Sequence, residues 1–165
     1  MRVRIFTDGA CSENPGPGGW AAVFNTATGC KVLSGNECQT TNNRMELMAM
    51  VQAMELIHNK GKRENQYEIY SDSAYVVNSI NKGWAEVSRD NGWVTTRNDK
   101  IKNRDLWQQY INAKQSLIKA GIDLTIIKVK GHSGDASNEY ADKMAKEEVL
   151  KAKALLSEKR GGRRA

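Results

Sequence analysis

Apolar and polar residues alternate in some short stretches of the chain and recur every three to four positions in others, which predicts strands interspersed with helices. Three strands are expected first, at residues 2–7, 20–25 and 31–37, and the Gly/Pro-rich segment 14–19 is expected to be a turn. Because no helix separates them, these three strands are expected to pair in antiparallel fashion.

Helical periodicity begins after the third strand. Thr41 or Asn42 is expected to cap a helix that ends near residue 59, with Gly61 as the stop signal. The remaining predicted elements are a strand at 67–71, a helix at 73–81, a helix at 105–119 capped by Asp105, a strand at 123–129 and a helix at 138–156. The order βββαβααβα indicates an α/β fold with a mixed five-stranded sheet. Residues 82–103 lack clear periodicity, so this long insertion is expected either to have a functional role or to be disordered.

Composition narrows the class of protein. The chain has 165 residues, 39% of them hydrophobic and 27% charged, which is typical of one soluble globular domain. No apolar run approaches a membrane span, and the N-terminus lacks the apolar stretch of a signal peptide. Three cysteines without a CxxC pair disfavour a disulfide framework and a zinc site, so a reducing, cytoplasmic location is expected. The net charge of +6 favours a polyanionic partner without identifying it.

Four acidic residues lie where predicted elements end or begin. Asp8 and Asp72 close strands, and Glu46 and Asp142 lie in the first turns of helices. Four carboxylates in a small volume would repel one another unless a cation compensated, and oxygen ligands of this kind select Mg²⁺ or Mn²⁺. Two such ions support phosphodiester hydrolysis by activating water and stabilising the leaving oxygen. Each acid alone can equally be a helix cap, a helix-dipole partner or a solvated residue.

The residues around these acids resemble those of the type 1 ribonuclease H family, in its bacterial single-domain branch, from about Arg2 to Glu147. The matching runs are Thr7-Asp8-Gly9-Ala10-Cys11, Asn14-Pro15-Gly16-Pro17-Gly18-Gly19, Thr40-Thr41-Asn42-Asn43-Arg44-Met45-Glu46-Leu47, Ser71-Asp72-Ser73 with Tyr75-Val76, Asp105-Leu106-Trp107, Val129-Lys130-Gly131-His132-Ser133-Gly134 and Asn138-Glu139 with Ala141-Asp142. All of these runs occur in order and with compatible separations.

The resemblance implies a ribonuclease H-like fold, with helices on both sides of the sheet and a protruding basic handle. It implies an endonuclease that cuts the RNA strand of RNA/DNA hybrids to 5'-phosphate and 3'-hydroxyl products. Little sequence preference is expected, because contacts with the backbone and 2'-hydroxyls carry no base information, and a monomer is the default expectation. It assigns Asp8, Glu46, Asp72 and Asp142 as catalytic ligands of Mg²⁺, with Mn²⁺ as a substitute and two ions when substrate is bound. His132 is expected to have an auxiliary role in water activation or product release, which its near-neutral titration suits.

Candidate substrate contacts also come from the resemblance. Cys11, Asn14, Asn42 and Asn43 are expected to contact the hybrid, and Thr41 with Asn103 to hold a phosphate of the DNA strand. Read singly, the asparagines and threonine are equally well explained as turn and cap residues. The segment 14–19 lacks the GK[ST] of a P-loop, so no nucleotide cofactor is expected.

The insertion at 82–103 corresponds to the basic protrusion of the family, although its net charge is only +2. Trp84 is expected to pack against the nucleic acid, whereas Trp93 either joins it or packs inward. Two departures from the family, Ala74 and Lys128, affect substrate contact and packing beside His132 rather than the carboxylates.

Domain limits and rival functions complete the expectations. Residues 1–150 are expected to form the catalytic domain, and residues 151–165 a frayed basic tail that is either a sequence-independent electrostatic aid or simply solvated. One rival is a non-catalytic hybrid-binding module, which has no use for clustered acids. A second rival class is the integrase-like and junction-cutting nucleases, and the sequences at 14–19 and 41–46 weigh against that class.

Overall fold

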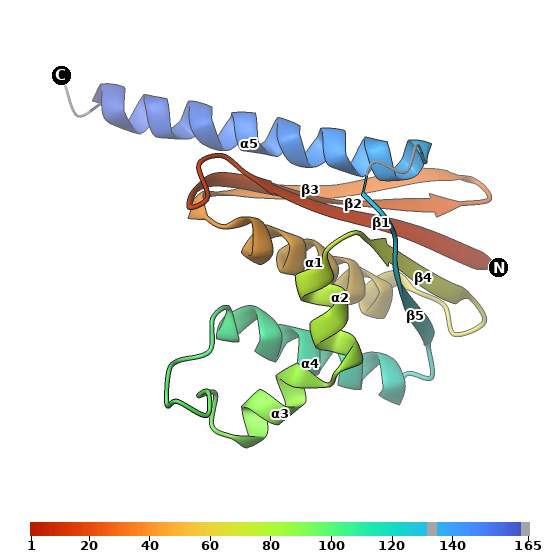
Figure 1. Cartoon of the computed structure of the whole chain (residues 1–165). Coiled ribbons are helices and arrows are strands. Elements are labelled where there is room, and N and C mark those ends of the chain that lie inside the picture. The colour runs from red at the N-terminus through yellow and green to blue at the C-terminus, as the bar shows by residue number, and fades with distance from the viewer. Residues whose placement is uncertain (132–134, 163–165) are drawn as a thin grey trace.

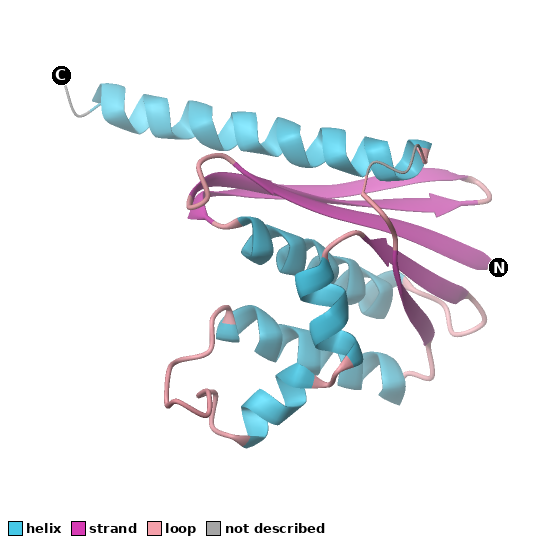
Figure 2. Cartoon of the chain, viewed as in Figure 1, coloured by secondary structure: helices cyan, strands magenta, loops and turns pink. Residues whose placement is uncertain are grey.

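The computed structural model describes residues 1–131 and 135–162 of the chain. The strands are β1 (Arg2–Cys11), β2 (Gly16–Thr26), β3 (Gly29–Thr40), β4 (Gln66–Ser71) and β5 (Asp123–Lys128). The helices are α1 (Asn42–Lys60), α2 (Ala74–Asn81), α3 (Trp84–Asp90), α4 (Arg104–Lys119) and α5 (Ala136–Gly162). Figure 2 shows how these elements are distributed.

The strands form one mixed sheet in the order β3-β2-β1-β4-β5. β1 pairs antiparallel with β2, and β2 with β3, whereas β4 lies parallel to both β1 and β5. The predicted five-stranded mixed sheet with three antiparallel strands is therefore confirmed. The parallel ladder between β1 and β4 ends at the pair Thr7 and Ser71, so Asp8 and Asp72 are the next residues on two adjacent strands.

Helices cover both faces of the sheet, as Figure 1 shows: α5 lies along one face and α1 along the other, with α2, α3 and α4 beyond α1. Successive side chains of β1 serve the two faces, because strand residues point alternately to opposite sides. Ile5 belongs to the main core with Leu47 and Trp107, and Phe6 packs with Val23 and Ala141 under α5. The expected placement of helices on both sides is confirmed.

The element order is βββαβαααβα, so the sequence prediction missed one helix, α3. This helix has only seven residues and starts after Gly83, whose φ is +64°, so it is too short for a clear hydrophobic period. After α3, Trp93 is buried in the main core, and the Arg104 guanidinium lies 5.7 Å from the centre of its ring. Of the two readings of Trp93, inward packing is the one observed.

Two helix ends also differ from expectation. Asp105 is not the cap of α4: Asn103 occupies that position with a φ of +60° and makes no side-chain capping bond, and Asp105 lies in the first turn. α5 extends to Gly162 rather than to residue 156, and it crosses residue 150 without a break. The expectation of a frayed tail is wrong as far as residue 162, because this segment is helical; Ala152 is buried and Leu156 half-buried, and the other described side chains from Lys151 onward are exposed.

The turn at residues 14–19 is shorter than expected, because β1 continues to Cys11 and β2 already begins at Gly16. In the part of the chain that is described, none of the helices has the length and apolar character to cross a bilayer.

Candidate active site

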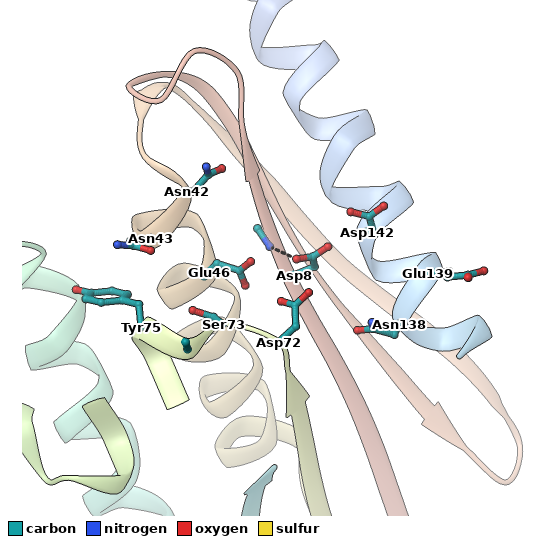
Figure 3. A pocket seen from close by; sticks show the side chains of 12 residues that line it. Asp8, Asn42, Asn43, Glu46, Asp72, Ser73, Tyr75, Asn138, Glu139 and Asp142 are labelled. Atoms are coloured by element: carbon teal, nitrogen blue, oxygen red, sulfur yellow. Dashed lines mark hydrogen bonds between the residues drawn. The ribbon is translucent and has the colours of Figure 1, made fainter. Parts of the chain in front are cut away.

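Three carboxylates meet at the edge of the sheet. Asp8 comes from β1, Asp72 directly follows β4, and Glu46 lies in the second turn of α1 (Figure 3). One oxygen atom of each lies within 4.8 Å of the others. This spacing allows a single cation to contact all three side chains.

A glycine explains how Glu46 comes so close to β1. A Cβ atom at Gly9 would overlap the backbone of Met45 and Glu46, so only glycine lets the strand and the helix approach in this way. The start of α1 is fixed by Thr41, whose hydroxyl accepts a hydrogen bond from the Arg44 N–H at 3.2 Å. The helix therefore presents Glu46 to the end of the sheet.

Asp142 approaches from the other side. It lies on α5, and in Figure 3 Asp8 lies between Asp142 and Glu46. It does not belong to the group within 4.8 Å, but it lines the same cavity. Its carboxylate forms an ion pair of 2.9 Å with Lys146, one helical turn further along α5. The structure thus brings three of the four predicted carboxylates into one group, and the fourth, Asp142, lines the same cavity and raises the pKa of Asp8.

The carboxylates are under electrostatic strain. Burial raises the pKa of Asp8 to about 7, and the charges of Asp72 and Asp142 act in the same direction, although a hydrogen bond with Glu46 opposes them. Burial, with the charges of Asp8 and Asp72, also raises the pKa of Glu46 well above its usual value. The buried Oε2 of Glu46 has no hydrogen-bond partner among the described residues. An orphaned carboxylate oxygen beside two further carboxylates fits a divalent cation.

A cavity of about 500 Å³ opens over the carboxylates. Its other lining residues are Gly9, Asn42, Asn43, Ser73, Ala74, Tyr75, Asn138 and Glu139. Asn42 and Asn43 were predicted as substrate contacts. Asn138 and Glu139 were missed as site residues, although they lie three to four positions before Asp142 on one helix, a spacing that places them on the same side.

Tyr75 connects the cavity to the insertion. Its hydroxyl accepts hydrogen bonds from the Asn103 side chain at 3.2 Å and from the Trp107 indole N–H at 3.0 Å. Trp84 packs edge to face on Trp107, with ring centres 5.6 Å apart. Two predicted substrate residues, Asn103 and Trp84, are therefore not in the cavity but join its wall through Tyr75 and Trp107. No spacing in the sequence indicated this connection.

The loop between β1 and β2 is tied to the start of α1. The Asn14 Oδ1 accepts a hydrogen bond from the Asn42 N–H at 3.0 Å. The Cys11 thiol lies 3.3 Å from the Thr40 carbonyl and 3.4 Å from the Gly16 carbonyl, either of which can accept its proton, and burial raises the thiol pKa. Cys11, Asn14 and Thr41 thus all make structural contacts here. For Asn14 and Thr41 this agrees with the alternative reading as turn and cap residues, whereas no structural role was predicted for Cys11.

Arg44 is a residue that the sequence prediction missed. It donates two hydrogen bonds to the carboxylate of Asp105, at 2.7 and 2.9 Å, and one to Glu37 at 3.2 Å. Because Asp105 is 61 residues away, no local pattern indicated this link between α1 and α4. The remaining candidate, His132, lies outside the described residues.

Comparisons with known proteins agree with this site. The sequence model of the RNase H family matches residues 1–150. A curated protein named Ribonuclease H, from Syntrophomonas wolfei, is 44% identical over 147 residues, which cover 89% of this chain and 95% of that protein. These matches support the use of a divalent metal ion by the clustered acids.

Solved structures show the same fold. The crystal structure of LC9-RNase H1, a type 1 RNase H with the type 2 active-site motif, superimposes with a TM-score of 0.69 at 29% identity and covers 87% of this chain and 70% of that chain. LC11-RNase H1, solved in complex with an RNA/DNA hybrid, has a TM-score of 0.66 at 22% identity, with 91% and 98% of the two chains covered. With its sequence match over 150 residues and its clustered carboxylates, this chain belongs to the RNase H family.

Proposed function

We propose that Asp8, Glu46, Asp72 and Asp142 bind two Mg²⁺ ions in the presence of substrate, with Mn²⁺ as a substitute, and that this site hydrolyses the RNA strand of RNA/DNA hybrids. The products would be a 5'-phosphate and a 3'-hydroxyl. The observation that carries the proposal is the cluster of Asp8, Glu46 and Asp72 within 4.8 Å, with the buried Glu46 Oε2 left unpartnered. A module that only bound hybrids would gain nothing from negative charge where phosphates approach.

The carboxylates define the chemistry of the site. Bound Mg²⁺ supplies a nucleophilic water at neutral pH and stabilises charge on the leaving oxygen. Asp8 and Glu46, whose pKa values are raised by burial, ionise fully when a cation compensates their charge. Asp142 would hold the cation in place of its ion pair with Lys146, which would leave Lys146 available to the substrate backbone.

Polar groups around the carboxylates would orient the hybrid. The exposed amides of Asn42 and Asn43 line the cavity and reach base edges and 2'-hydroxyls in the minor groove. We assign Cys11 and Asn14 to contacts with the hybrid through their backbone. The Cys11 side chain already binds the Thr40 or Gly16 carbonyl, and the Asn14 side chain already binds the Asn42 N–H. Thr41 accepts a hydrogen bond from the Arg44 backbone N–H and Asn103 accepts one from the Arg44 guanidinium, so both lie next to Arg44, where a DNA phosphate would bind.

The insertion and His132 complete the assignments. Trp84 is half-buried on Trp107, so its exposed edge would pack against a sugar of the DNA strand. We assign His132 an auxiliary role in proton transfer or product release, so that its loss slows the reaction without abolishing it.

A monomer in a reducing, cytoplasmic compartment is the setting that we propose for this chain. The thiol of Cys11 supports this location, because it donates a hydrogen bond from the end of β1 to the backbone of β2 or β3 and would lose it on oxidation. We expect size-exclusion chromatography with light scattering to give the mass of one chain.

Cleavage of a labelled hybrid tests the function. We expect the RNA strand to be cut in Mg²⁺, no cutting in chelator, and no cutting of matched DNA or RNA duplexes. Asp8→Asn and Asp72→Asn should each remove nearly all turnover while hybrid binding persists. A hybrid that is bound but remains uncut in both Mg²⁺ and Mn²⁺ would support the non-catalytic binding module instead.

A further inference from the structure

One side of α5 carries a row of charges that changes sign along the helix. Glu139 and Asp142 line the cavity, and Lys146, Lys153 and Arg160 follow at intervals of four, seven and seven residues from Asp142. At 3.6 residues per turn, these positions lie within about 40° of one another around the helix axis: Asp142, Lys146, Lys153 and Arg160. The acids between Lys146 and Arg160 are Glu147, Glu148 and Glu158, and each lies about 100° or more away from the row around the helix axis.

The basic side chains of this row are exposed to solvent and are therefore accessible to a ligand. Lys153 and Arg160 are exposed, and the Lys146 side chain is 63% exposed despite its ion pair with Asp142. The buried side of the helix is formed by other positions, Ala145, Val149 and Ala152. The row is therefore not required to hold α5 on the sheet.

The geometry of the neighbouring loop places this side of α5 toward the substrate. Lys146, Val149 and Leu150 line a small hollow together with Ala10, Cys11 and Ser12, the residues where β1 leads into the loop to β2. Figure 1 shows α5 running past this loop and beyond the edge of the sheet. A duplex that enters the active site and contacts the loop would thus continue alongside the second half of α5.

We propose that Lys146, Lys153 and Arg160 form a basic arm that binds the phosphate backbone of the hybrid beyond the active site. This inference rests on the proposed function, because it takes the same hybrid as the ligand. Asp142 and Arg160 are separated by 18 positions, or roughly 27 Å along the helix. At 3.4 Å per base pair, a duplex must extend roughly eight base pairs from Asp142 to reach Arg160 and roughly five to reach Lys153.

The arm is particular to the second half of this helix. The match to the RNase H family model ends at residue 150, whereas two of the three arm residues come after it. Residues 151–165 contain six basic residues and one acidic residue, so the extension adds positive charge rather than a further apolar core. Charge of this kind contributes to affinity without base recognition.

The test measures hybrid affinity against salt in chelator, so that no turnover is needed. The variant Lys153→Gln/Arg160→Gln is compared with wild type and with Lys143→Gln/Lys159→Gln, which removes equal charge from positions about 100° away on either side of the row. We expect the arm variant to lose on the order of tenfold in affinity at low salt and about two units of salt slope. The control should lose much less of either, and Lys153→Arg/Arg160→Lys should bind like wild type.

Duplex length provides the second readout. For a hybrid of roughly 30 base pairs the full loss is expected, and for a hairpin hybrid with a stem of roughly four base pairs it should nearly vanish, because that stem is too short to extend from the active site to Lys153. Equal losses in the arm and control variants, or equal losses on both duplexes, would overturn the arm. Failure of the proposed function is distinguishable, because wild type would then leave the RNA strand intact in Mg²⁺ whatever the affinities.

Discussion

Arg44 on α1 and Asp105 on α4 form a two-pronged ion pair, with nitrogen-to-oxygen distances of 2.7 and 2.9 Å. The pair fixes the catalytic helix, which carries Glu46, against the helix that follows the insertion. The Arg44 guanidinium lowers the pKa of the Asp105 carboxyl by its hydrogen bonds and its charge. The contribution of this ion pair to the free energy of unfolding therefore depends on pH, and this dependence can be measured.

We expect Asp105→Asn to reduce the free energy of unfolding at neutral pH by about 1 kcal/mol or less, because Asp105 is more than half exposed. Since the folded-state pKa is lowered, the contribution is present above the unfolded pKa and is lost as pH falls through the folded value. Urea denaturation at pH 7 and at pH 3 checks this, and the two proteins should converge in acid. A difference that grew in acid would contradict the ion pair.

The second prediction concerns Asp8 in metal-free protein. Because burial raises its pKa to about 7, the folded state loses stability as pH rises from the unfolded value, near 4, toward 7. Asp8→Asn removes the charge, so we expect a gain of roughly 2 kcal/mol at pH 7 and little gain at pH 4. Thermal denaturation in chelator measures both.

Mg²⁺ provides the control for Asp8. Bound cation should stabilise wild type more than Asp8→Asn, because the variant has lost a ligand and the repulsion that the cation relieves. A variant that was less stable than wild type at pH 7 in chelator would show that Asp8 is not under electrostatic strain.

Tyr75 gives a third prediction. In Tyr75→Phe the Trp107 indole N–H is left without its acceptor in the buried core, which should cost about 1–2 kcal/mol. Because Asn103 also loses its partner, we expect KM for the hybrid to rise while kcat stays near the wild-type value. The exposed Tyr140 supplies the matched control, and Tyr140→Phe should change neither stability nor KM. An unchanged KM in Tyr75→Phe would show that the hydrogen bond between Asn103 and Tyr75 does not contribute to substrate binding.

The contact between Gly9 and α1 gives a fourth prediction. In Gly9→Ala the new methyl group meets the backbone of Met45 and Glu46, so α1 must move away from β1. We expect a loss of roughly 1–3 kcal/mol in stability and a larger proportional loss of turnover, since Glu46 shifts with its helix. Gly161→Ala, where a Cβ atom meets no other atom, is the control and should be neutral or slightly stabilising. Normal turnover in Gly9→Ala would show that the position of Glu46 is not critical.

Local signals in the sequence predicted most of the fold and the elements that supply the four acids of the cavity. Alternation and helical spacing located the five strands and four of the helices, and the ends of these elements marked Asp8, Glu46, Asp72 and Asp142. Their meeting point depended on the parallel pairing of β1 with β4, which no local pattern determines. The resemblance to the RNase H family supplied that information.

What the sequence did not reveal depends on contacts between distant residues. Asp105 was taken as a helix cap because an acid at a helix start commonly caps it, whereas its carboxylate binds Arg44 instead. α3 was missed because seven residues span only two turns. The length of α5 was underestimated because its last turns have no buried stripe to mark them.

The links between the β1–β2 loop and the start of α1 also affect the thermodynamics of association. The Asn14 side chain accepts a hydrogen bond from the Asn42 N–H, and the Cys11 thiol reaches the Thr40 carbonyl, so two segments of the proposed hybrid-binding surface are held together in the protein without substrate. Little conformational entropy then remains to be lost when the duplex arrives. The binding free energy can instead be used to orient the scissile phosphate, and association can proceed without a slow folding step at the loop.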